Sequence, residues 1–130
     1  IGPLGGGTLL PEAAAGQKWR APEEAAALEN PFSHTRATIA AGKKIYKQNC
    51  IACHGSKGRG KGPAAIALEP KPPRFKDRNV ASQADGAFFW KISTGRAPMP
   101  SWGKTLSQEE IWQVIHYLHT FTGKMRQAGM

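Results

Sequence analysis

The sequence predicts a small all-α domain of about three to five helices, preceded by an irregular N-terminal extension. Its 130 residues are the length of one domain. Apolar residues recur at helical spacing in several segments, and no segment shows the alternation of a half-buried strand. No apolar run approaches the roughly 20 residues of a membrane helix. We therefore expect no transmembrane segment, and the residues from Ile1 onward do not have the pattern of a signal peptide.

The extension is predicted to cover residues 1–33, and the domain residues 34–130. The segment from Gly2 to Gly7 is rich in glycine. Prolines occur at positions 3, 11, 22 and 31 of the extension. This composition is typical of a linker or tether. One short helix is expected after Pro22, and the large apolar ring of Trp19 predicts that part of the extension docks on the domain.

Two longer helices are predicted at either end of the domain. Thr38 is the expected cap of the first, which extends to about Gln48. The last follows Ser107, which forms a capping box with Glu110, and Gly123 ends it. The apolar face of this last helix recurs at helical spacing and consists of Ile111, Val114, Ile115 and Leu118.

A middle helix is predicted from Ser82 to Ser93, ended by Gly95. Its apolar residues are Phe88, Phe89, Trp90 and Ile92. Between the first and middle helices lies a long loop, residues 55–80, with seven basic residues against two acidic ones. Loops of this length are usually functional or disordered.

Cys50, Cys53 and His54 form the C-x-x-C-H pattern of covalent haem attachment. Two thiols separated by two residues on a helical turn reach the two vinyl groups on one porphyrin edge. The histidine that follows them is then delivered to the iron. One covalent haem c would also supply the internal support that a glycine- and proline-rich domain needs.

Three other interpretations of the two cysteines compete with haem attachment. A disulfide between them would close a very short loop and contribute little stability. A thioredoxin-like redox pair needs a strand-turn-helix setting, and no strand pattern is visible. A zinc site needs four ligands, and His116 and His119 have the wrong spacing for a zinc finger.

Met99 is the predicted sixth ligand of the haem iron. It lies between Pro98 and Pro100, which restrict the backbone and favour a stiff, extended loop. Met125 and Met130 lie beyond the last helix. The alternative role for Met99 is ordinary core packing, which methionine also serves well. Ligation by histidine and methionine would give a higher reduction potential than ligation by two histidines.

The chain resembles the class I c-type cytochromes of bacterial respiratory type over about residues 36–122. The resemblance rests on Gly42 to Tyr46, Cys50 to Gly55, Gly60 to Pro63, Phe89 to Ile92, Met99-Pro100 and Ile111 to Leu118. It implies a class I cytochrome c fold around one haem, a periplasmic or otherwise extracytoplasmic location, and an electron carrier rather than an enzyme. The family also implies that the Pro63 carbonyl orients the His54 ring.

Further haem contacts are expected once a covalent haem is assumed. Trp90 and its apolar neighbours in the middle helix become candidates for the haem wall. The resemblance places Gly42, Tyr46 and Tyr117 where the first and last helices cross. Arg74, Trp102 and Lys104 are candidates for contact with the haem propionates.

The charge of the chain predicts an acidic partner. The whole chain carries +9, and residues 34–130 carry sixteen basic against five acidic residues, or +11. Such a field accelerates encounter with acidic redox proteins. No nucleic-acid-binding module accompanies the charge, although a solvated basic face without a partner is the plainer alternative. Two other functions stay open: a haem-relay subunit or domain of a larger oxidoreductase complex, and a ligand-binding haem with an open sixth site.

Overall fold

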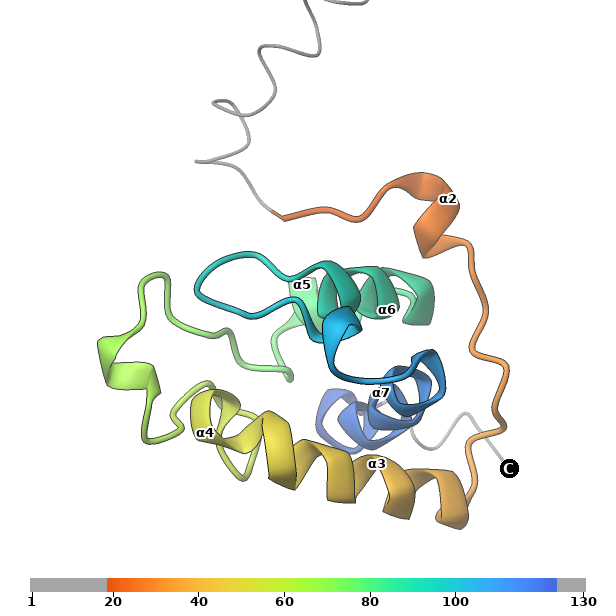
Figure 1. Cartoon of the computed structure of the whole chain (residues 1–130), viewed down its shortest axis with the longest axis horizontal. Coiled ribbons are helices and arrows are strands. Elements are labelled where there is room, and N and C mark those ends of the chain that lie inside the picture. Colours follow the sequence, from red (N-terminus) through yellow and green to blue (C-terminus); the bar gives the residue numbers. More distant parts are fainter. Residues whose placement is uncertain (1–18, 124–130) are drawn as a thin grey trace, which may run out of the picture.

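The computed structural model describes residues 19–123, which fold as an all-α domain (Figure 1). The α-helices are α2 (Glu23–Ala26), α3 (Arg36–Asn49), α4 (Ile51–His54), α5 (Arg78–Ala81), α6 (Asp85–Thr94) and α7 (Gln108–Thr122), and the 3₁₀ turns are η1 (Ala65–Ala67) and η2 (Trp102–Lys104). Within this described range the only β pairing is an isolated bridge between Arg96 and Met99. The predicted all-α class is therefore confirmed. None of the described helices is both long and apolar enough to cross a membrane.

The core lies where α3 crosses α7. The ring of Tyr46 packs against that of Tyr117, with centroids 5.2 Å apart. Gly42 lets the two helices approach closely, because a Cβ there would lie 2.2 Å from the Gln113 carbonyl oxygen. The predicted meeting of Gly42, Tyr46 and Tyr117 at this crossing is confirmed. The largest fully buried side chains around it are Tyr46, Ile111, Val114 and Ile115.

The ends of α3 and α7 follow from local capping chemistry. The predicted box is present at α7, where Ser107 and Glu110 satisfy each other's backbone N–H groups, and Gly123 ends the helix with a φ of 88°. At α3 the predicted cap is wrong by three residues. Thr35 is the N-cap and Thr38 is its partner in the box. Two threonines three residues apart satisfy the same pattern, so the sequence did not distinguish them.

The middle helix is shorter than predicted and has a separate turn before it. α6 begins at Asp85 rather than at Ser82, because Ala84 has an extended backbone. The preceding residues form α5, a short helix that the sequence pattern did not predict. Gly95 ends α6 as predicted.

Residues 19–34, here called the N-terminal strap, run across α6 and α7 (Figure 1). The predicted short helix is present as α2. Gly86 admits α2 against α6, since a Cβ at Gly86 would lie 2.2 Å from the Ala25 carbonyl oxygen. Trp19 docks as expected, with its ring centroid 6.4 Å from that of Trp90. The domain boundary after residue 33 stays a prediction.

Candidate haem site

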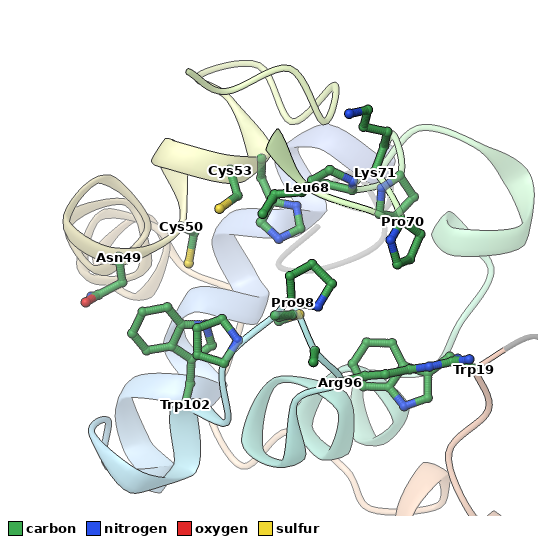
Figure 2. Close-up of a pocket in the computed structure, with 16 residues that line it drawn as sticks. Trp19, Asn49, Cys50, Cys53, Leu68, Pro70, Lys71, Arg96, Pro98 and Trp102 are labelled. Atoms are coloured by element: carbon green, nitrogen blue, oxygen red, sulfur yellow. The ribbon is translucent and has the colours of Figure 1, made fainter. Parts of the chain in front are cut away.

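A cavity of about 390 Å³ lies between the turn that carries the cysteines and the turn that carries Met99 (Figure 2). Cys50, Cys53, His54, Met99 and Trp102 all line it. A second cavity of about 140 Å³, here called the inner cavity, extends toward the core. It shares Cys50, His54, Met99 and Trp102 with the first, which is here called the outer cavity. Residues of α6 and α7 form the inner wall of this second cavity: Phe88, Lys91, Ile92, Val114 and Leu118.

Cys50 ends α3 and begins α4, so the haem motif occupies the junction of two helices. The His54 N–H donates to the Cys50 carbonyl at 2.9 Å, which closes one helical turn around the motif. No disulfide joins the two cysteines. Burial, with the neighbouring Cys53, raises the pKa of Cys50 to about 12. The described residues contain no cluster of metal-ligating groups that would hold zinc.

His54 is half-buried in the cavity wall, with its ring stacked on Phe75 at a centroid distance of 4.9 Å. Burial lowers the pKa of His54 to about 4, so the imidazole is neutral at physiological pH, the form that binds a metal. Its Nδ1 is buried without a hydrogen-bond partner. The bond expected from His54 to the Pro63 carbonyl is therefore not made here, and the ring lies against Phe75 instead. The backbone around Pro63 nevertheless lies on α4, since Gly62 N–H donates to the Cys53 carbonyl at 3.0 Å.

Met99 is positioned by a tight turn rather than by the predicted extended loop. Arg96 N–H donates to the Met99 carbonyl at 3.1 Å, and Met99 N–H donates to the Arg96 carbonyl at 2.9 Å. Gly95, with a φ of 72°, allows the chain to enter this turn from α6. The two reciprocal bonds supply the rigidity that the prolines alone were expected to provide.

The comparison with known proteins agrees with this geometry. The family described as cytochrome c oxidase, cbb3-type, subunit III matches residues 37–118. The chain belongs to this family. It is a c-type cytochrome domain of the class I all-α fold, from a family of electron-transfer haem proteins whose cofactor is haem c. The resemblance to c-type cytochromes seen in the sequence is confirmed.

Similar proteins include both large subunits and small single-domain cytochromes. The cbb3-type cytochrome c oxidase subunit CcoP of Azospirillum brasilense is 33% identical over 72% of this chain, which spans 32% of that relative. Cytochrome c6 of Chlorolobion braunii is 29% identical over 64% of this chain and 90% of its own length. In a solved structure, the Kuenenia stuttgartiensis reducing HAO-like protein complex Kustc0457/Kustc0458, a chain is 35% identical with a TM-score of 0.62. The alignment covers 74% of this chain and 48% of that one.

The cytochrome domain brings only some of the predicted haem contacts to the cavity. Trp102 lines both cavities. Arg74 lies outside them, with its side chain 58% exposed and 3.8 Å from the Asp77 carboxylate. Lys104 is exposed and lines neither cavity, and Pro63 borders a separate, open hollow in the basic loop.

Trp90 also lies outside both cavities, which corrects its assignment to the haem wall. Phe88 and Ile92, four residues apart, share the face of α6 that lines the inner cavity. Trp90 is about 200° around the helix from Phe88 at 100° per residue, so it faces away and packs on the strap. Phe89 similarly stacks on Trp112, with centroids 4.1 Å apart.

Several residues that line the outer cavity were not predicted from the sequence, among them the polar or aromatic side chains of Trp19, Asn49, Lys71 and Arg96. Lys71 donates to the Ala65 carbonyl at 3.2 Å and to the Ile66 carbonyl at 2.9 Å, which holds the covering loop together. Arg96 could have been found from its place in the Met99 turn. Trp19 carried a docking signal, but nothing local indicated where it would dock.

The other three histidines, which are the alternatives to Met99 as an iron ligand, make their contacts elsewhere. His34 Nδ1 lies 2.8 Å from His116 Nδ1, and His119 Nε2 lies 2.7 Å from the Asp85 carboxylate. None of these three histidines lines either cavity. Among the described residues, Met99 is therefore the thioether or imidazole that lines both cavities together with His54.

Proposed function

We propose that this domain binds one haem c covalently through Cys50 and Cys53, with His54 and Met99 as the two iron ligands, and transfers single electrons. The supporting observation is the cavity itself. It gathers the three residues of the attachment motif and a methionine 45 positions after His54 around one hollow. Cys, His and Met are the side chains that attach and ligate c-type haem.

Each residue would have a distinct task toward the cofactor. Cys50 and Cys53 would hold the haem through two thioether bonds, in which the S–H bond and the vinyl π bond are replaced by one C–S and one C–H bond, so no atom is lost and no oxidant is consumed. A bound haem supplies the one-electron redox couple. Met99 raises the reduction potential relative to a second histidine. The apolar residues Phe88, Ile92 and Leu118 limit water at the inner wall.

The cations near the cavity support a role in cofactor or partner binding. Lys71 and Arg96 line its wall, and Trp102 adds an indole N–H. For the propionate contacts, Lys71 and Arg96 join Trp102 in place of Arg74 and Lys104, because charge-assisted bonds from cations suit carboxylates. Beyond the cavity, the net +11 of residues 34–130 suits docking to an acidic redox protein.

A periplasmic or otherwise extracytoplasmic carrier is the favoured setting, and a relay domain in an oxidoreductase complex is the second candidate. The relatives that are oxidase subunits favour a relay domain, because this chain spans only about a third of the length of each. A free carrier is favoured by cytochrome c6, of which it spans 90%. Size-exclusion chromatography of the native protein distinguishes them, since a relay domain elutes with a larger assembly.

The haem proposal is tested by the mass of the denatured protein after acid-acetone extraction. The expected mass is that of the polypeptide plus one intact haem. Cys50→Ala with Cys53→Ala should remove the haem from the polypeptide. A wild-type protein matured with the haem-attachment machinery that nevertheless lacks this mass would refute the proposal.

A further inference from the structure

Trp19 lines both cavities although it precedes the first cysteine of the motif by 31 residues. It is the residue of the N-terminal strap that reaches this site. Figure 2 shows its ring beside Arg96 and across the cavity from Cys50 and Cys53. The family match covers residues 37–118, so Trp19 lies outside it. A segment beyond the matched region thus contributes to the wall of the candidate haem site.

The ring of Trp19 is seated by cations from two different elements. Lys91 of α6 places its Nζ 5.5 Å from the ring centroid, and the Arg96 guanidinium carbon lies 6.0 Å from it. Cations at this range are attracted to the face of an indole. Lys91 is itself fixed, because its Nζ donates to the Gln83 side-chain oxygen at 2.6 Å. Trp19 therefore occupies a formed seat between α6 and the Met99 turn.

The strap is fastened at its other end, against α7. Asn30 donates its side-chain N–H to the Trp112 carbonyl at 3.0 Å. His116 Nε2 lies 2.7 Å from the Phe32 carbonyl, which can only accept, so this nitrogen carries the proton. The Nδ1 of neutral His116 must then accept, and His34 Nδ1 donates to it at 2.8 Å. The chain between Trp19 and these contacts has little slack, since Gly86 seats α2 on α6.

We propose that Trp19 is a haem-contacting residue, brought across the domain by the strap to close the cavity against water. This inference rests on the proposed haem function. Water exclusion around a metal site lowers the local dielectric, which changes its reduction potential. A drier wall disfavours the more highly charged oxidised iron, so Trp19 raises the potential. The basic rim formed by Lys91 and Arg96 acts in the same direction.

The test compares Trp19→Ala with Leu28→Ala in the holoprotein. Leu28 is a matched control on the same strap, 52% exposed and outside both cavities. The readouts are the midpoint potential, the haem mass and the near-infrared band of methionine ligation. We expect Trp19→Ala to shift the potential downward while keeping the haem and the band, and Leu28→Ala to leave the potential unchanged. An unchanged potential in Trp19→Ala would overturn the proposal.

Asn30→Ala provides a second, independent arm that leaves the cavity residues intact. Loosening the strap should lower the potential by less than Trp19→Ala does. In the double variant the Asn30 change should add nothing further, because the two residues act through one wall. Full additivity would overturn the proposal, since the strap would then act without Trp19. A wild-type chain without covalent haem would instead refute the proposed function, and the haem mass separates these two failures.

Discussion

Gly42 of α3 lies directly against the Gln113 carbonyl of α7, at a distance that leaves no room for a Cβ. Gly42→Ala should therefore destabilise the domain, although alanine is the better helix former. Overpacking of this kind typically costs about 1–3 kcal/mol of unfolding free energy. Denaturant unfolding of the holoprotein measures the change.

Ala40→Gly is the matched control for this substitution, because Ala40 is exposed on the same helix. It should cost only the roughly 0.5–1 kcal/mol of glycine in a helix interior. A Gly42→Ala variant as stable as the wild type would show that α3 and α7 separate easily.

Met99→Ala should abolish the near-infrared sulfur-to-iron band of the oxidised protein and lower its reduction potential. The reason is loss of the thioether that the Arg96–Met99 turn presents to the cavity. Absorption spectroscopy and redox titration measure both effects. Met125→Ala, outside the described residues, is the control and should keep the band. A wild-type protein without the band, ligated by His34, His116 or His119, would contradict the assignment.

The rate of electron transfer to an acidic partner should fall steeply as ionic strength rises. Weak redox encounters depend on long-range attraction, which is screened beyond about 8 Å at 0.15 M salt. Lys61→Glu should slow the reaction more than Lys43→Glu. Lys61 borders the open hollow of the basic loop, and this hollow adjoins the outer cavity because Lys71 lines both. Lys43 is exposed on α3 and lines neither the hollow nor the cavity. Stopped-flow kinetics supply the rates.

A rate that does not respond to salt would contradict this prediction of electrostatic steering. The positive charge would then serve solubility, or the domain would be fixed within a complex where no encounter occurs. Equal effects of the two reversals would show that the whole field acts, rather than the hollow.

The domain should lose stability as the pH falls below about 6.5, because of His34 and His116. Burial lowers the pKa of both from 6.5; the neighbouring histidines lower that of His34 further, and Asp85 opposes the shift in both. As the pH falls, the unfolded chain therefore takes up protons before the folded chain does. The free energy of unfolding declines from about pH 6.5, the pKa of an unfolded histidine, until the pH has passed below the folded pKa values. Protonation of His116 also ends the His34–His116 bond, since both Nδ1 atoms would then be donors.

Unfolding free energies measured at pH 5 and pH 7 test this expectation. Asp85 is the carboxylate that faces this pair of histidines. Burial acts to raise its pKa, but the bonds from His119 and Asn30 outweigh burial and lower the pKa. It titrates below the tested range, so its contribution is the same at both values. His34→Gln should reduce the difference between pH 5 and pH 7. A difference of the same size in that variant would assign the pH dependence to other groups.

The haem motif and the caps of the last helix were predictable because their chemistry is local. Cys50, Cys53 and His54 lie within one helical turn, so their spacing alone brings three side chains to one place. Ser107 and Glu110 satisfy the first N–H groups of α7 by the same short-range logic. The same local chemistry did not identify the start of α3, because Thr35 and Thr38 both suit the N-cap position.

Only the tertiary structure decided which distant residues share the cavity. Trp90 belongs to a strongly apolar run but faces the strap, whereas Trp19, in a segment with the composition of a linker, lines the cavity. Arg74 and Arg96 are both basic residues in loops, and only Arg96 is carried to the site, by its bonds to Met99. Local patterns report backbone conformation and the chance of burial. The wall that a side chain joins depends on how helices and loops pack, and those contacts connect residues far apart in the chain.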